Sequence, residues 1–310
     1  MRALVSLLAD RPVVAAILGA FTIAGSAVLV ALADVAPSTA AFFRCAYALP
    51  PLALLAWYER RRYGPRPFGQ VRLAWFAGAF FAADLILWHH AINQVGAGLA
   101  TVLGNTQVVV VPLAAWLFLG ERPSGRVAIS VPVVLTGVVL ISGVIGTGAY
   151  GENPVLGVAL GLLTGIAYGG FILVQRGANA DRRRPASPLF DATLATALIC
   201  LVVGLPLGEI DLVPTWPAHG WLLILALGIQ VVGWLLISIS LPRLPAAITS
   251  VVLTIQPVAS VLLGMLILSE APSGFQLLGT AFILAGLLLA TLRVPARASS
   301  SAQPAIAPDR

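Results

Sequence analysis

The stretch Leu117–Gly125, which reads LFLGERPSG, recurs 149 residues later at Leu266–Gly274 as LILSEAPSG. The match extends without a gap from Ala97–Leu140 to Ala246–Leu289, and about a third of the aligned positions are identical. This period is too long for a solenoid, whose repeats span roughly 20–50 residues. Both copies lie in apolar runs of bilayer length, which indicates an internal duplication within a membrane protein.

The composition is also that of a membrane protein. Hydrophobic residues make up 59% of the 310 residues and charged residues only 10%, against roughly a quarter in soluble domains. The two cysteines, Cys45 and Cys200, lie in apolar runs and indicate small buried side chains. The chain has no HExxH motif, Walker-type loop or GxSxG motif, so we predict no metal site, no cofactor and no enzymatic activity.

Ten segments are long and apolar enough to span a membrane, since about 20 residues at about 1.5 Å each cross the hydrocarbon core. Pro, Gly or charged residues separate them. We therefore predict an all-α membrane protein with ten transmembrane helices. The predicted segments are residues 12–33, 38–58, 73–94, 97–119, 125–147, 154–174, 188–208, 219–241, 246–268 and 274–293.

The arginines lie on one side of these segments. With the N-terminus in the cytoplasm, seventeen of the 18 basic residues fall on the inner side, and only Arg44 lies inside a segment. This distribution predicts a multi-pass protein of the bacterial inner membrane with both termini cytoplasmic. Because the basic clusters belong to the inner loops, we expect the lipid bilayer as a partner and no nucleic acid.

The duplication divides the chain into two halves of five predicted helices each. An odd number of spans per copy inserts the second copy upside down, which gives two inverted five-helix repeats and favours alternating access. We predict a first repeat at residues 1–148, a second at residues 149–293 and a disordered tail at residues 294–310.

The doubled motif resembles that of a known family. Both copies read Leu-(Gly/Ser)-Glu-x-Pro-Ser around Glu121 and Glu270, and Gln107 and Gln256 precede them. The pattern is similar to the end of the fourth helix in the EamA family of the drug/metabolite transporter superfamily, as is the ten-helix count. The resemblance implies transport of a small molecule, since characterised bacterial members are often exporters of amino acids and related metabolites. Related small multidrug members use a carboxylate in the first helix, where this chain has none.

Two charged residues lie within the predicted spans. Asp84 falls near mid-membrane, and Arg44 lies on the preceding helix. A charge at the bilayer centre is costly unless it is paired or hydrated, so Asp84 is a candidate for substrate or proton handling. By helical rise both residues lie roughly 10–15 Å from the outer helix ends, which leaves open an ion pair that merely pins the two helices together.

His89 and His90 follow on the third predicted helix. His89 shares a helix face with Asn93, and His90 points about a quarter-turn away. Histidine titrates near physiological pH, so His90 joins Arg44 and Asp84 as a coupling candidate, with a packing role as the alternative. Adjacent histidines do not point at one ion, which argues against a metal.

Polar and aromatic residues on several helices are candidates to line a cavity between the third, fourth, sixth, eighth and ninth helices. Gln107 and Gln256 are repeat-related, and Gln230 and Trp234 share a face at i,i+4. Bonding between helices is the alternative role for such polar side chains. The substrate-binding candidates are Asp84, Trp88, His89, Asn93, Asn105, Gln107, Tyr168, Gln230, Trp234 and Gln256.

These features predict a secondary transporter that exports a small neutral or zwitterionic metabolite such as an amino acid, a substrate implied by the family resemblance. The alternative is broad-range efflux of lipophilic or cationic compounds, with Asp84, Trp88 and Trp234 facing an apolar cavity. Protons are the candidate coupling ion. The sequence is compatible with a monomer or a homodimer.

Overall fold

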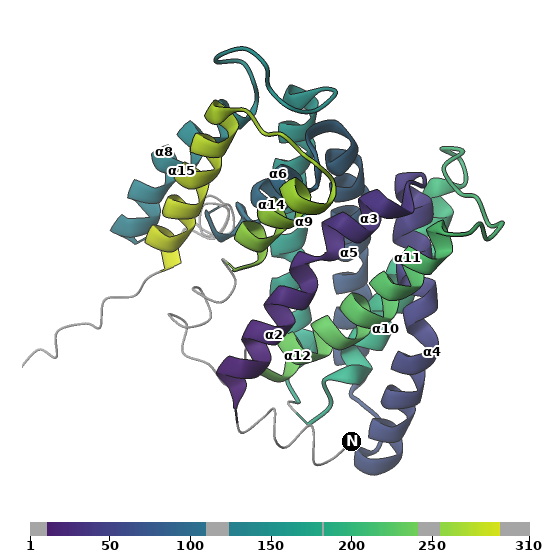
Figure 1. The fold of residues 1–310 in the computed structure, drawn as a ribbon. Helices are drawn as coiled ribbons and strands as arrows, with labels where there is room; N and C mark the ends of the chain where they lie inside the picture. Colours follow the sequence, from purple (N-terminus) through teal and green to yellow (C-terminus); the bar gives the residue numbers. More distant parts are fainter. Residues whose placement is uncertain (1–10, 110–123, 182, 241–254, 292–310) are drawn as a thin grey trace, which may run out of the picture.

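The computed structural model describes residues 11–109, 124–181, 183–240 and 255–291, which are almost entirely helical (Figure 1). The helices of the first half are α2 (Pro12–Ala24), α3 (Ser26–Ala33), α4 (Pro37–Tyr63), α5 (Phe68–Val95), α6 (Ala97–Gly104) and α8 (Gly125–Ile141). Those of the second half are α9 (Pro154–Ala178), α10 (Ala186–Gly204), α11 (Ala218–Ile224), the π-helix η1 (Leu225–Gly233), α12 (Trp234–Ser240), α14 (Ile255–Ile267) and α15 (Gly274–Thr291).

Each of the ten predicted segments contains helix within the described residues. Six helices there are long and apolar enough to cross a membrane: α2 with α3, α4, α5, α9, α10, and the run from α11 to α12. Three shorter apolar helices are α8, α14 and α15. Parts of the segments at residues 97–119 and 246–268, the motif around Glu121 and the predicted tail lie outside the described residues. The prediction of an all-α membrane protein is confirmed.

Local sequence signals set several helix ends. α4 begins at Pro37 and α9 begins at Pro154. Proline lacks a backbone N–H, but the N–H at the first position of a helix has no acceptor within the helix, so no hydrogen bond is lost. The Asn153 side chain accepts a backbone N–H in the first turn of α9. At its other end α4 stops at Gly64, whose φ of 79° favours glycine.

The helix contacts follow a two-fold pattern. The repeat-related pairs α4 with α10, α6 with α14, and α8 with α15 each pack together. Among the remaining contacts, α5 also packs against α10. The pairs α5 with α9 and α2 with α12 join the third span to the sixth and the first span to the eighth. Exchanging the two halves converts one of these pairs into the other, as expected for inverted repeats.

Glycines allow close contact between α8 and α15, which lie side by side (Figure 1). A Cβ at Gly137 would lie 2.5 Å from the carbonyl oxygen of Gly279, and a Cβ at Gly279 would lie 2.6 Å from that of Gly137. A Cβ at Gly286 would lie 3.3 Å from the carbonyl oxygen of Ser130. Gly286 and Gly279 lie 149 residues after Gly137 and Ser130, so the two contacts are equivalent by the repeat.

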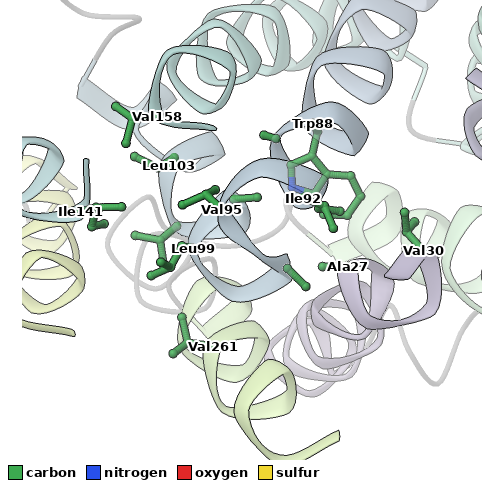
Figure 2. Close-up of a cluster of buried hydrophobic side chains, with 14 of the residues drawn as sticks. Ala27, Val30, Trp88, Ile92, Val95, Leu99, Leu103, Ile141, Val158 and Val261 are labelled. Carbon is green, nitrogen blue, oxygen red and sulfur yellow. The ribbon is translucent and has the colours of Figure 1, made fainter. Parts of the chain in front are cut away.

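A hydrophobic cluster at the junction of α5 and α6 joins the two halves (Figure 2). Val95, Leu99 and Leu103 lie in this cluster together with Val158 of α9 and Val261 of α14. Burial of these side chains therefore stabilises the contact between the first half and the second.

Candidate functional site

A cavity of about 70 Å³ lies among helices of both halves. Its wall comes from the five predicted helices α5, α6, α9, α12 and α14, and also from α2, α3 and α4. The volume is well below the roughly 300–1,000 Å³ of pockets for drug-sized ligands. Its polar and aromatic lining residues are Ser26, Arg44, Phe81, Asp84, Trp88, Thr101, Asn105, Thr164, Tyr168, Trp234 and Gln256.

Arg44 enters the cavity from α4 and is held on two sides. Its Nε donates to Gln230 Oε1 at 3.0 Å, and its Nη1 donates to Ser26 Oγ at 3.2 Å. Gln230 is fully buried, and its Nε2 donates in turn to Thr193 Oγ1 at 3.2 Å. Gln230 therefore fixes the guanidinium from behind instead of lining the cavity itself.

Asp84 lines the same cavity and is 7% exposed. Among the described residues, its carboxylate has neither a hydrogen bond nor an ion pair, and it does not pair with Arg44. A carboxylate without a direct partner at this depth is costly, and the nearby Arg44 charge offsets only part of that cost. The cavity thus holds a cation that the protein has positioned and a carboxylate that it has left unpaired.

Two irregular helix segments place the residues around Arg44. The first span breaks at Gly25 between α2 and α3, and Ser26 follows directly. The eighth span is a π-helix from Leu225 to Gly233, a distortion that is frequent at functional sites. The π-helix removes Gln230 from the cavity face of Trp234, although the α-helical i,i+4 spacing predicts one shared face.

Aromatic rings form much of the remaining wall. The rings of Phe81 and Trp234 meet edge to face with centroids 5.7 Å apart, and Tyr168 meets Trp234 at 6.2 Å. Phe171 stacks behind Phe81 at 4.4 Å. With Trp88, these rings make much of the lining apolar, and the Arg44 guanidinium lies over the Phe81 ring, 5.8 Å from its centroid.

Three polar atoms in the lining are buried without a hydrogen-bond partner in the described part of the chain. They are Nε1 of Trp234, Nε2 of Gln256 and Oγ1 of Thr164. Leaving such groups unsatisfied costs about 1–3 kcal/mol each, so a ligand that accepts hydrogen bonds here removes this cost. Thr164 was missed from sequence, although it lies one helical turn from Tyr168.

The two repeat-related glutamines are not equivalent. Gln256 lines the cavity, whereas Gln107 is buried outside it. Asn105 lines the cavity, and its Nδ2 donates to the carbonyl oxygen of Thr101 at 2.9 Å. The Thr101 hydroxyl, also in the lining, accepts from Ser260 of α14 at 3.0 Å.

His89, His90 and Asn93 lie outside the cavity lining. His89 is buried, with Nδ1 3.0 Å from the carbonyl oxygen of Pro37. His90 Nε2 lies 2.9 Å from Glu209 Oε1, and the Asn93 side chain is exposed. These residues are on the last turns of α5, between the cavity and the end of the helix.

Three glutamates that are not among the predicted site residues cap helices of the opposite half. Glu59 of α4 accepts from the backbone N–H groups of Ala186 and Ser187, at the start of α10, at 2.9 and 2.8 Å. At the other end of the same helix pair, Glu209 accepts from the Ser38 hydroxyl at the start of α4. We call these contacts carboxylate caps, because a carboxylate meets the positive end of a helix.

The third carboxylate cap involves the repeated motif. Glu270, from the second copy, accepts from the backbone N–H groups of Ala97 and Gly98, at the start of α6, at 2.5 and 3.1 Å. Burial raises the pKa of Glu270, and the two N–H donors oppose that rise. Its counterpart Glu121 lies outside the described residues.

Comparisons with known proteins agree with this architecture. The EamA-like transporter family matches the chain twice, at residues 11–143 and 155–292. A solved structure titled "Crystal structure of protein" matches 91% of this chain and 96% of its own, with a TM-score of 0.59 and 17% identity, which shows a shared fold. No curated protein sequence matches the chain. The double family match covers most of the sequence, and the chain belongs to the EamA-like transporter family, a family of drug/metabolite-type membrane transporters.

Proposed function

We propose that this transporter exports a small zwitterionic metabolite, such as an amino acid, across the bacterial inner membrane by alternating access. The observation that carries the proposal is that one cavity contains both a cation and a carboxylate that do not form an ion pair with each other. Arg44, held by Gln230 and Ser26, binds the substrate carboxylate, and the unpaired Asp84 binds its ammonium group. Both contacts are charge-assisted hydrogen bonds.

The neutral donors and the volume of the cavity support the same substrate class. The unpartnered N–H groups of Trp234 and Gln256 offer further donors to a carboxylate. A cavity of about 70 Å³ suits a small metabolite better than a drug-sized compound. The two repeats, taken as residues 1–148 and 149–293, rock around this cavity with both termini on the cytoplasmic side.

Proton coupling follows from the role of Asp84. On the cytoplasmic side, the Asp84 carboxyl group releases its proton and binds the substrate ammonium group. On the outer side, it takes up a proton and releases the substrate. Each cycle moves one substrate out and one proton in, with Asp84 as the exchanging group.

The test is counterflow of radiolabelled amino acids into liposomes that contain the purified protein. We expect Asp84→Asn to lower the initial rate about 10- to 100-fold, as for loss of a charged hydrogen bond. The matched control is Asp34→Asn: Asp34 is exposed in a turn with φ of 47°, a conformation that asparagine accepts. Full counterflow by Asp84→Asn, at equal thermal stability, would refute the proposal.

Efflux of lipophilic cations is the second candidate. The aromatic rings of Phe81, Trp88 and Trp234 beside the Asp84 carboxylate support it, since such rings attract organic cations. Arg44→Gln separates the two candidates. The variant loses counterflow of a zwitterion but keeps, or improves, transport of a cation that has no carboxylate.

A further inference from the structure

A second hollow lies where α4 ends and α10 begins, away from the central cavity. Its volume is about 420 Å³. Three arginines line it, Arg60 and Arg66 around the end of α4 and Arg184 before α10, with Asp191 as its one lining carboxylate. The lining thus carries a net charge of +2 at the end of α4.

Arg66 is only partly satisfied. Its side chain is 10% exposed, and its Nη2 pairs with Asp191. Its Nη1 is buried with no hydrogen-bond partner in the described residues. A buried guanidinium nitrogen in this state favours an additional acceptor.

The other charges near the hollow are already engaged. Arg184 donates to the carbonyl oxygens of Tyr63 and Gly64, which fixes the turn after α4. Asp181 pairs with Arg183 and Arg184, and the hydrogen bond from Arg183 lowers its pKa to about 2. Arg60 is exposed and forms no ion pair with any described residue. Arg60 and Arg66 are therefore the arginines left to bind an anion.

Apolar surface adjoins these arginines. Trp57, 56% exposed, lines the hollow together with Phe190. A neighbouring hollow shares Val71 with it and is lined by Phe68 and Phe76 of α5. A ligand that complements both hollows therefore needs an anionic head for the arginines and apolar chains for the aromatic side chains.

We propose that this hollow binds the phosphate headgroup of an anionic phospholipid, with Arg60 and Arg66 on the phosphate and the acyl chains against Trp57 and Phe68. Arginine suits phosphate because its planar N–H groups match two oxygens at once. In the proposed orientation the site faces the cytoplasmic leaflet, where basic pockets between helices bind such lipids. The bound lipid contacts α4 of the first repeat and α10 of the second.

The test is native mass spectrometry of the full-length protein in detergent, titrated with phosphatidylglycerol, with phosphatidylcholine and with inorganic phosphate. We expect retention of phosphatidylglycerol over phosphatidylcholine. Arg60→Gln and Arg66→Gln should each weaken it about fivefold, as for loss of one charge near the membrane surface. The control is Arg62→Gln, an equal charge change at an exposed residue outside the hollow.

A further variant separates a lipid site from an internal ion pair. Asp191→Asn releases Arg66 from its partner, so we expect phosphatidylglycerol to bind about fivefold more tightly. Equal binding by Arg60→Gln, Asp191→Asn and the control would overturn the proposal. Displacement of the lipid by inorganic phosphate would overturn the lipid assignment in favour of a soluble phosphate ligand. Because the readout is lipid retention, failure of the transport proposal leaves this one unaffected.

Discussion

The α4–α10 pair carries a carboxylate cap at each end, and the two caps differ in what holds them. Glu59 is 8% exposed and accepts two backbone N–H groups and the Ser187 hydroxyl. The side chain of Glu209 is 22% exposed and accepts from the Ser38 hydroxyl and from His90. Ser38 and Ser187 are 149 residues apart and so are related by the repeat, whereas Glu59 and Glu209 are 150 residues apart and fall one position out of that register.

This difference indicates which end of the α4–α10 pair stays closed and which end opens. The Glu59 cap satisfies backbone donors that have no other partner, so breaking it leaves buried N–H groups unpaired. The Glu209 cap relies mainly on a hydroxyl and an imidazole, with a smaller contribution from the Ser38 backbone, at a partly solvated position where water replaces the lost partners. We expect the end of the pair with Glu209 to separate first.

The largest effect is expected from Glu59→Ala. This change leaves the N–H groups of Ala186 and Ser187 without an acceptor, and we expect a loss of about 2–5 kcal/mol in the free energy of unfolding. Thermal unfolding in detergent micelles measures it. Glu59→Gln is the control, since one amide oxygen remains and the loss should be smaller. Unchanged stability of the alanine variant would remove the distinction between the two caps.

A second test uses the Glu270 cap. A Cβ at Gly264 would overlap the Glu270 carboxylate, so we expect Gly264→Ala to cost about 1–3 kcal/mol by displacing it. Gly228→Ala is the matched control, because an added Cβ there meets nothing within 4 Å. If both variants unfold at the wild-type temperature, α14 shifts to accommodate the added Cβ at little cost, and the Glu270 cap contributes little to stability.

For Glu209→Ala we expect a smaller loss, about 1–2 kcal/mol at neutral pH. Burial alone would raise the pKa of Glu209, but hydrogen bonds from Ser38 and His90 bring it below the ordinary 4.5. A depressed pKa makes the cap's contribution complete above the ordinary value and lost as pH falls through the folded value. The difference in unfolding temperature between variant and wild type should therefore be larger at neutral pH than at about pH 3.

The smallest effect is expected from His90→Gln. Glutamine still donates a hydrogen bond to Glu209 in place of the imidazole, and a partly exposed pair of this kind contributes less than about 1 kcal/mol. The sharper readout is the pH profile of counterflow. If it matches that of wild type, the imidazole has no part in opening this end.

The fold was predictable because bilayer length, arginine placement and the repeat each constrain it independently. The helix of α4, for example, follows from an apolar run that ends in Arg60, Arg61 and Arg62. The caps were not predictable. Glu209 lies 171 residues from Ser38 in a loop without periodic pattern, and no local signal links them.

The sequence predicts which helices form the candidate site better than it predicts which residues line it. Asp84, Trp88 and Tyr168 lie on regular helices, where spacing gives the facing side correctly. Gln230 and Ser26 lie at a π-helix and at a helix break, which change the register that a 3.6-residue period assumes. Arg44 stood out as the one basic residue in a span, but its partners depend on those two irregularities.

The glycine contact between α8 and α15 implies something about how such a chain arose. Gly137 meets Gly279, and the equivalent residues Gly286 and Ser130 meet in the same way. This is an isologous interface, the kind formed between two identical subunits, here enclosed within one polypeptide. A five-helix unit present as a single gene copy would already carry a self-complementary surface. Two such units inserted in opposite directions would assemble without a linker, and a gene fusion would then fix their ratio and leave each half free to specialise.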